Sequence, residues 1–195
     1  MQTPDHTYGV FMQFLTAHFN ADEEQLKTIC SKFSRKTAKR NEILLASGEV
    51  CKHLYFVNSG CLRIYLLDLK GNESTRFLVT EGKFGTSFPS YRLQEPSVAA
   101  IQSLELSDLF YISYHDFQAL LDEIPAWEHI YRIALEQEYI SSIQRIESLI
   151  SMNATMRYQA LMESNPSIIQ RFPSKIIADY LGISQETLSR LKSKK

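Results

Sequence analysis

The sequence predicts an α+β protein with three parts: an antiparallel β-roll or jelly-roll domain, a long helix, and a small C-terminal helix-turn-helix domain. Three observations predict it. Glycines recur at nearly regular intervals at positions 48, 60, 71 and 82, with β-rich runs between them. Residues 127–150 contain neither Gly nor Pro. The last two dozen residues have the pattern of two short helices joined at a glycine. We place the domain boundaries at 1–125, 126–151 and 152–195.

Two amphipathic helices are expected before the sheet. One covers residues 8–19, and the next starts at Asn20 or Asp22 and carries Leu26, Ile29 and Phe33 at helical spacing. From Glu42 the pattern changes to short β-rich runs between turn residues, which is typical of an antiparallel sandwich or jelly roll. The predicted strands cover residues 43–46, 53–58, 62–67, 75–79, 98–102 and 109–113.

The long helix carries an apolar stripe that steps by three or four residues along its length. The stripe permits two interpretations: it packs on the protein's own core, or it forms a coiled-coil-like seam between two copies of the chain. Asn153 is expected to cap a further helix over 154–163, which Asn165-Pro166 ends. The stripe residues, and hence the predicted dimer interface, are Tyr131, Leu135, Tyr139, Ile143, Ile146 and Ile150.

The C-terminal segment has the features of a helix-turn-helix. Ser174 is a candidate N-cap of its first helix, and Gly182 supplies the left-handed residue that the turn requires. Ser184 is expected to cap the second helix. The apolar residues that hold the two helices together are Ile177, Ala178, Leu181, Ile183, Leu188 and Leu191.

The outward face of the second helix carries Gln185, Glu186, Ser189 and Arg190. A helix of this kind lies in the DNA major groove and presents its N-terminal outward side chains to base edges. Gln pairs with adenine, Glu with cytosine N4, and Arg with guanine O6 and N7. These residues predict binding to double-stranded DNA. The alternatives are a plain helical hairpin, or a vestigial motif in a small-molecule sensor that acts through protein partners.

The charge distribution agrees with a DNA-binding end. Residues 171–195 hold six basic and two acidic residues, a net charge of +4, whereas the whole chain has a net charge of −1. A basic end suits contact with phosphate, although a solvated lysine tail would have the same composition.

Other classes of protein have little support in the sequence. Cys30, Cys51 and Cys61 form no CxxC pair, and three unpaired cysteines suit a reducing cytoplasm. The five histidines form no HxH, and GxSxG, P-loop and GxGxxG patterns do not occur, so neither an enzyme nor a metal site is predicted. No spacing singles out a haem ligand pair, so no cofactor is predicted. No secretory or membrane-spanning segment is expected.

The order of these parts resembles the Crp/Fnr family of bacterial transcription regulators. The most specific segments are residues 54–65, Gly82-Lys-Phe-Gly85 and residues 177–192. The resemblance implies a cyclic-nucleotide-binding-type β-roll, a dimerisation helix and a winged helix-turn-helix that acts at promoters, with RNA polymerase as a further partner. It also implies that Gln185, Glu186 and Arg190 contact bases. The full set of predicted DNA-binding residues is Ser174, Ser184, Gln185, Glu186, Ser189, Arg190, Lys192 and Lys194.

Two positions depart from members of the family that bind cyclic AMP. Thr86 stands where those members have a ribose-binding Glu, and Pro96 stands where they have a phosphate-binding Arg. Pro lacks both a guanidinium and an N–H, so it cannot hold a phosphate. We therefore expect an effector other than cyclic AMP, or none. The candidate ligand pocket consists of Phe84, Gly85, Thr86, Ser87, Arg92 and Ser97.

The end of the chain is a further departure. A winged domain has a β-hairpin after its recognition helix, whereas here only Ser193-Lys-Lys follows it. The terminal lysines are expected either to take over part of the wing's phosphate contact or to fray in water.

Overall fold

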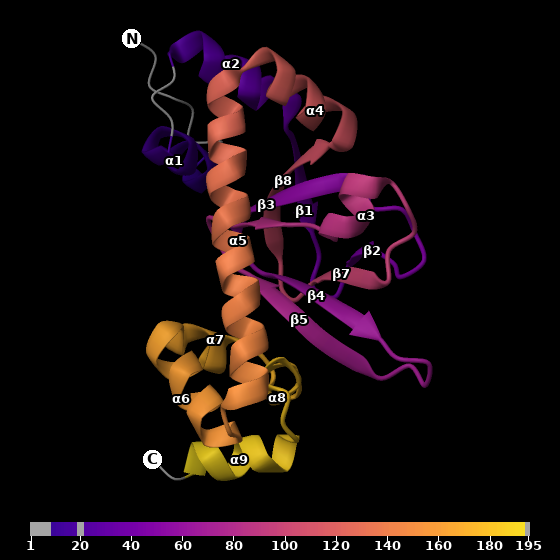
Figure 1. The fold of residues 1–195 in the computed structure, drawn as a ribbon, viewed down its shortest axis with the longest axis vertical. Coiled ribbons are helices and arrows are strands. Elements are labelled where there is room, and N and C mark those ends of the chain that lie inside the picture. The colour runs from indigo at the N-terminus through magenta and orange to yellow at the C-terminus, as the bar shows by residue number, and fades with distance from the viewer. Residues whose placement is uncertain (1–8, 19–21, 194–195) are drawn as a thin grey trace.

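The computed structural model describes residues 9–18 and 22–193, and it shows an α+β protein. A β-roll lies beside the long helix α5 (Pro125–Ser151), and four short helices gather at the far end of α5 (Figure 1). The predicted fold class is therefore confirmed. Helix α5 extends slightly beyond the predicted 127–150, because Pro125 occupies its first turn, where a missing N–H costs nothing.

The β-roll consists of two four-stranded antiparallel sheets with strand orders β1-β8-β3-β6 and β2-β7-β4-β5. All six strands predicted from the sequence are present with small shifts at their ends. The strands are β1 (Ser34–Ala38), β2 (Ile43–Leu45), β3 (His53–Ser59), β4 (Leu62–Leu67), β5 (Glu73–Val79), β6 (Phe84–Gly85), β7 (Ala99–Ser103) and β8 (Ser107–Ser113).

The turn between β3 and β4 depends on Gly60. Its φ of +100° is a conformation that residues with a Cβ rarely adopt, and an added Cβ would collide with Ser107. Its N–H donates to Glu81 Oε1 at 2.8 Å, which fixes the carboxylate of Glu81 at the edge of the β-roll. This carboxylate also serves the contact with the C-terminal helices described below.

Helices α1 (Gly9–His18) and α2 (Glu23–Lys32) precede the roll. Phe11 and Leu15 of α1 are completely buried in the β-roll core. Asp22 caps α2 by accepting from the N–H of Gln25 at 2.8 Å. Of the two predicted starts of this helix, Asn20 and Asp22, the second is therefore confirmed. The remaining predicted helix positions, residues 8 and 19–20, lie outside the described residues.

Besides α4 (Tyr114–Glu123), four elements were not predicted from the sequence: β1, β6, α3 (Phe88–Leu93) and α7 (Pro166–Arg171). Strand β1 has the sequence SRKTA and is mostly exposed, so it lacks the apolar alternation by which strands are recognised. It forms because its backbone pairs with β8 from Ser34 to Ala38. The other three are short, two to six residues, and give no periodic signal.

Apart from α4, the remaining helices follow the expected order. They are α4 (Tyr114–Glu123), α6 (Ala154–Ser164), α8 (Ser174–Leu181) and α9 (Gln185–Ser193). Asn153 caps α6 by accepting from the N–H of Met156 at 3.0 Å, as predicted. Two apolar clusters result. The larger fills the β-roll and includes Trp127 of α5, and the smaller joins the C-terminal helices to Cys61 and Leu104 of the roll.

Candidate nucleic-acid interface and effector cavity

Helices α8 and α9 meet at a tight turn and share a buried face. Gly182 adopts φ +65°, and its N–H bonds to the carbonyls of Ala178 and Asp179. Ser184 caps α9 by accepting from the N–H of Thr187 at 3.1 Å. Ile177 and Leu188 are completely buried between the helices. The roles predicted for Gly182 and Ser184 are thus confirmed.

The opposite face of α9 is exposed and polar. Gln185, Glu186, Ser189 and Arg190 all face solvent. The guanidinium of Arg190 reaches Thr187 Oγ1 at 3.4 Å, a weak contact that leaves its fork available. The face therefore has donors and acceptors for base edges and no apolar side chain among these four residues.

Two further predicted residues, Ser174 and Lys192, contact each other beside this face. Ser174 is the first residue of α8 rather than its N-cap; Pro173 occupies the cap position and has no side-chain oxygen to offer, so that prediction was wrong. The Ser174 hydroxyl instead accepts from Lys192 Nζ at 3.1 Å, which ties the start of α8 to the last turn of α9. Lys194 lies outside the described residues.

The helix-turn-helix is fastened to the β-roll by two charged contacts. Arg171, at the end of α7, donates to the carboxylates of Glu81 and Glu105. Asp179 of α8 accepts from the Thr75 N–H at 2.7 Å and from the Thr75 hydroxyl. The apolar contact with Cys61 and Leu104 lies in the same interface, and burial raises the pKa of the Cys61 thiol to about 12.

Asp179 also contacts a buried arginine of the roll. Arg63 of β4 is 2% exposed, and its Nη2 reaches Asp179 Oδ2 at 3.4 Å and Glu73 Oε2 at 2.9 Å. Its Nε donates to Thr75 Oγ1 at 2.9 Å. A buried guanidinium needs such partners, because an unpaired buried charge is costly. The sequence did not single out these interface residues, since their partners are distant along the chain.

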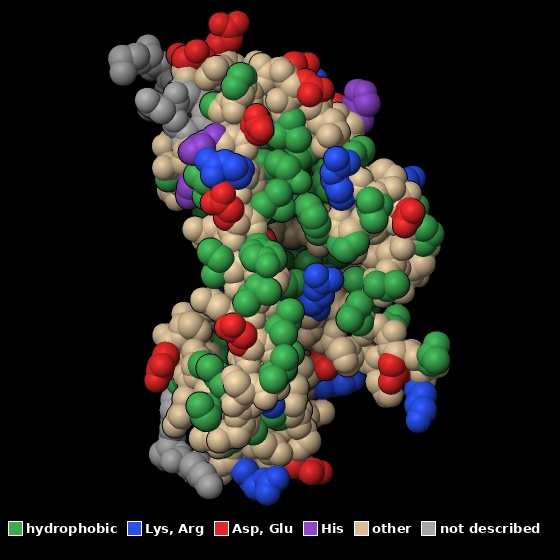
Figure 2. Space-filling model, in the orientation of Figure 1, with side chains coloured by type: hydrophobic (Ala, Val, Ile, Leu, Met, Phe, Trp, Pro, Cys, Tyr) green, Lys and Arg blue, Asp and Glu red, His purple; other side chains and the backbone are tan. Residues whose placement is uncertain are grey.

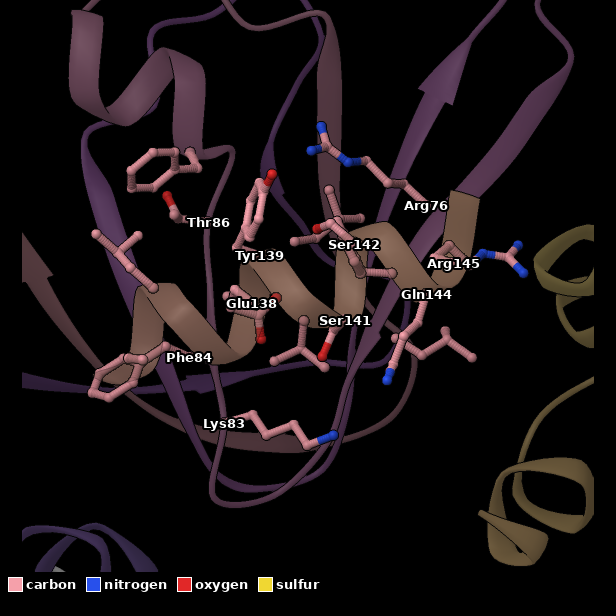
Figure 3. Close-up of a pocket in the computed structure, with 18 of the residues that line it drawn as sticks. Arg76, Lys83, Phe84, Thr86, Glu138, Tyr139, Ser141, Ser142, Gln144 and Arg145 are labelled. Carbon is pink, nitrogen blue, oxygen red and sulfur yellow. The ribbon is translucent and has the colours of Figure 1, made fainter. Parts of the chain in front are cut away.

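A cavity of about 1200 Å³ lies between the β-roll, α5 and the C-terminal helices (Figure 3). Its β-roll end is mainly apolar and aromatic, with Phe84, Trp127 and Tyr131 in the wall. Its other end lies against α8 and α6. Figure 2 shows hydrophobic side chains gathered around this hollow and along α5.

The predicted pocket residues divide into two groups. Phe84, Gly85 and Thr86 line the cavity, whereas Ser87, Arg92 and Ser97 do not. Ser97 donates to the Ser87 hydroxyl at 2.7 Å in a buried pair, and the exposed Arg92 donates to the Tyr114 hydroxyl of α4 at 2.8 Å. These three side chains are thus engaged with other parts of the chain.

Charged groups of the cavity come from residues that the sequence did not indicate. Figure 3 shows Lys83 of the loop before β6, Glu138 of α5 and Arg76 of β5 around it. Partial removal from water raises the pKa of Glu138, against the opposing effect of Lys83. Trp127 Nε1 is buried without a hydrogen-bond acceptor in the described part of the chain. This N–H is enclosed in the core and is not open to the cavity.

The apolar stripe of α5 divides between two environments. Tyr131 packs on Phe117 with ring centroids 5.0 Å apart, and Leu135 lines the cavity. Tyr139, Ile143, Ile146 and Ile150 are exposed, with Ile150 at 80% and Tyr139 at 69%. The stripe therefore packs on its own chain at one end and is exposed at the other, where Tyr139 and Ile150 also line the cavity.

Among the described residues, no group of three or more His, Cys, Asp or Glu side chains is placed to hold a metal ion. No helix in the described ranges combines the length and the apolar character needed to cross a membrane.

Comparisons with known proteins agree with this architecture. The family model for the cyclic nucleotide-binding domain matches residues 35–123. The anaerobic regulatory protein of Pasteurella multocida (strain Pm70) is 23% identical over 201 residues, covering 95% of this chain and 72% of that protein.

Solved structures share the fold. FixK2 from Bradyrhizobium japonicum has a TM-score of 0.71 at 16% identity, covering 83% of each chain. A putative regulator from Eubacterium rectale, described as a member of the crp/fnr family, has a TM-score of 0.67 at 17% identity and covers 96% of this chain and 86% of its own. With its β-roll, long helix and terminal helix-turn-helix, the chain resembles the transcription regulators of the Crp/Fnr family.

Proposed function

We propose that this protein is a homodimeric transcription regulator that binds a two-fold symmetric DNA site through helix α9. One observation carries the proposal: α9 buries Leu188 against α8 and leaves Gln185, Glu186, Ser189 and Arg190 exposed. A helix that only closes a hairpin has no need for a contiguous set of side chains that match base edges.

The chemistry of the exposed face supports sequence-specific reading. Arg190 offers a fork for guanine O6 and N7, Gln185 suits adenine, and Glu186 accepts from cytosine N4. Ser184 caps α9, and its hydroxyl and the N-terminus of the helix favour a nearby phosphate. Lys192 and the neighbouring Ser174 would lie at the rim of such a contact.

The dimer follows from the exposed half of the α5 stripe. Tyr139, Ile143, Ile146 and Ile150 present a row of large apolar side chains on one helix. Two copies packed along this row would bury it and present two α9 helices to a two-fold DNA site. The proposed role places the protein at promoters, where RNA polymerase is the expected further partner.

The cavity is the proposed effector site, and its chemistry disfavours cyclic AMP. Thr86 donates its hydroxyl to the His53 carbonyl at 3.0 Å, and Pro96 is paired with Val50 in an isolated bridge. Neither residue offers a charged partner for a cyclic phosphate. The mainly apolar wall favours a largely apolar effector.

Selection of duplexes from a random library tests the proposal. The expected product is a two-fold symmetric site whose half-sites are centred about one or more helical turns apart. Sequence-specific reading would be contradicted if no sequence were enriched above background and all duplexes bound with the same, cation-dependent affinity. Enrichment of a single unpaired half-site would contradict the dimer.

A further inference from the structure

The turn before α9 is held by two arginines that come from outside the helix-turn-helix. The last carbonyls of a helix have no partners within it, so something else must satisfy them. At the end of α8, the carbonyls of Ala178 and Asp179 accept from Gly182, and Ile183 also donates to Ala178. The next three carbonyls, those of residues 180–182, require donors from elsewhere.

Arg157 of α6 supplies two of these donors. Its Nε donates to the Leu181 carbonyl at 2.8 Å, and its Nη2 donates to the Gly182 carbonyl at 3.3 Å. Its Nη1 donates to the Met152 carbonyl at 2.5 Å, at the end of α5. One planar guanidinium thus joins the C-terminus of α5 to the turn of the helix-turn-helix.

Arg145 of α5 supplies the third donor. Its Nη2 donates to the Tyr180 carbonyl, and its guanidinium lies over the Tyr180 ring at 4.5 Å from the centroid. Figure 3 shows this side chain directed from α5 toward the C-terminal helices, away from Thr86. Burial lowers the pKa of Arg145, but an arginine remains charged at any pH at which the protein is folded.

A close apolar contact completes the attachment. A Cβ added at Gly182 would lie 3.3 Å from Leu149 Cδ2, so the turn backbone packs directly against α5. The contacts made by Arg145, Leu149 and Arg157 therefore span the last two turns of α5 and the carbonyls just before the cap of α9. Leu188 packs α9 against α8, so the turn and α9 are expected to move together.

We infer that Arg145 and Arg157 are positioning residues that set the orientation of α9 relative to α5, and hence the spacing of DNA half-sites that the dimer accepts. The inference rests on the proposed function. Neither arginine is proposed to touch a base. Because they bind backbone carbonyls, they affect the position of α9 and not the base sequence that α9 recognises.

The preference of the dimer for one spacing between half-sites distinguishes positioning from a general loss of stability. Loss of folded protein lowers the affinity for every duplex by the same factor, whereas loss of positioning changes the ratio between duplexes. The duplex series keeps the selected half-sites fixed and varies the spacer by one and two base pairs in each direction, with a single half-site as the reference. Each base pair shifts a half-site by about 3.4 Å along the axis and rotates it by roughly a tenth of a turn.

The variants are Arg145→Lys and Arg157→Lys, each with its alanine counterpart. Lysine retains the charge near the helix C-terminus but cannot reach several carbonyls from one fork, so the lysine variants should remain folded. Arg132→Ala is the matched control, since Arg132 lies on the same helix and pairs only with the exposed Glu136 and His129 among the contacts described.

The expected result is a flatter spacing profile. In the lysine variants the ratio of affinities between the preferred and neighbouring spacers should fall about 3- to 10-fold, the effect of losing about one net hydrogen bond. Single half-site affinity should stay within about twofold of the wild type, and Arg132→Ala should match the wild type throughout. Variants that keep the wild-type spacing ratio, or that lose half-site affinity as strongly as full-site affinity, overturn the inference. A wild-type protein without any two-fold site overturns the proposed function instead.

Discussion

Arg171 and Glu81, ninety residues apart in sequence, form a double hydrogen bond between the C-terminal helices and the β-roll. Nη1 and Nη2 of the guanidinium donate to Oε2 and Oε1 of the carboxylate at 3.0 and 2.6 Å. Glu81 Oε1 also accepts from the Gly60 N–H, so a turn of the roll holds the carboxylate in the position where it binds Arg171. The relationship places the C-terminal helices against the roll of their own chain.

Glu81→Gln should lower the free energy of unfolding by about 1 kcal/mol, measured by urea denaturation at pH 7. The amide removes the charge from a partly exposed, bidentate contact, and one carboxylate, Glu105, remains for Arg171. Glu136→Gln is the control, because its exposed pair with Arg132 within one helix should contribute about 0.3–0.5 kcal/mol. A loss no larger than that of the control would show that the interface contact contributes nothing beyond a surface pair.

The difference between wild type and Glu81→Gln should depend on pH. Burial acts to raise the pKa of Glu81, but hydrogen bonds from Arg171 and from backbone N–H groups outweigh it and hold the pKa below the ordinary 4.5. A carboxyl whose pKa is lowered by folding stabilises the protein above its unfolded pKa and loses that effect as the pH falls. The stability difference should therefore be constant above about pH 5.5 and shrink below pH 4.5. A difference that grows on acidification contradicts this contact.

Ile143→Lys should convert the dimer to monomer in sedimentation velocity. Ile143 lies in the exposed half of the α5 stripe, and in a two-fold seam the substitution would bury two ammonium groups without partners. Leu69→Lys is the control, since Leu69 is fully exposed at the β4–β5 turn and the dimer should be unaffected. A variant that remains dimeric at unchanged affinity would place the seam elsewhere.

Cyclic AMP should give no heat of binding in isothermal titration at millimolar nucleotide. Thr86 and Pro96 lack the carboxylate and guanidinium that would hold the ribose and the cyclic phosphate, and Arg92 is engaged with Tyr114 outside the cavity. A saturable isotherm in the micromolar range would contradict this prediction and would point to Lys83 or Arg76 in the cavity as the phosphate partner.

The local parts of the structure could be predicted from sequence because their signals are local. Gly182 is recognisable as the turn residue between two helical patterns, and Ser184 as the cap that follows it. The strands are recognisable as β-rich runs that lie between glycines. Ser174 was misassigned because Pro173 and Ser174 both suit a helix start, and only the geometry shows which one precedes the helix.

The contacts between the parts could not be predicted in the same way. Arg157 binds backbone carbonyls, and because every residue type has one, the sequence does not show which residues will accept. The pairing of Arg171 with Glu81 and of Asp179 with Thr75 depends on how the C-terminal helices dock against the roll. The effector site was predicted from residues near Phe84, yet Ser87 and Ser97 bond to each other inside the roll and Arg92 bonds to Tyr114 of α4.

Arg190 is the residue of α9 whose substitution best tests whether this helix reads DNA bases. Its side chain is exposed on the same face as Gln185 and Glu186, and its contact with Thr187 is weak. The measurement is the affinity of Arg190→Ala for a selected operator and for a scrambled duplex, each titrated at several salt concentrations. Arg132→Ala on α5 is the matched arginine control, and Lys194→Ala tests a phosphate contact that is not base-specific.

Arg190→Ala should weaken operator binding by about 1–3 kcal/mol and relax the preference at one base pair. Its binding to the scrambled duplex should change little. Lys194→Ala should weaken binding to both duplexes similarly and lower the salt slope by roughly one unit. Arg132→Ala should match the wild type. Equal losses on both duplexes for Arg190→Ala would reduce that residue to a positioning contact, and no loss on either would contradict a groove-reading α9.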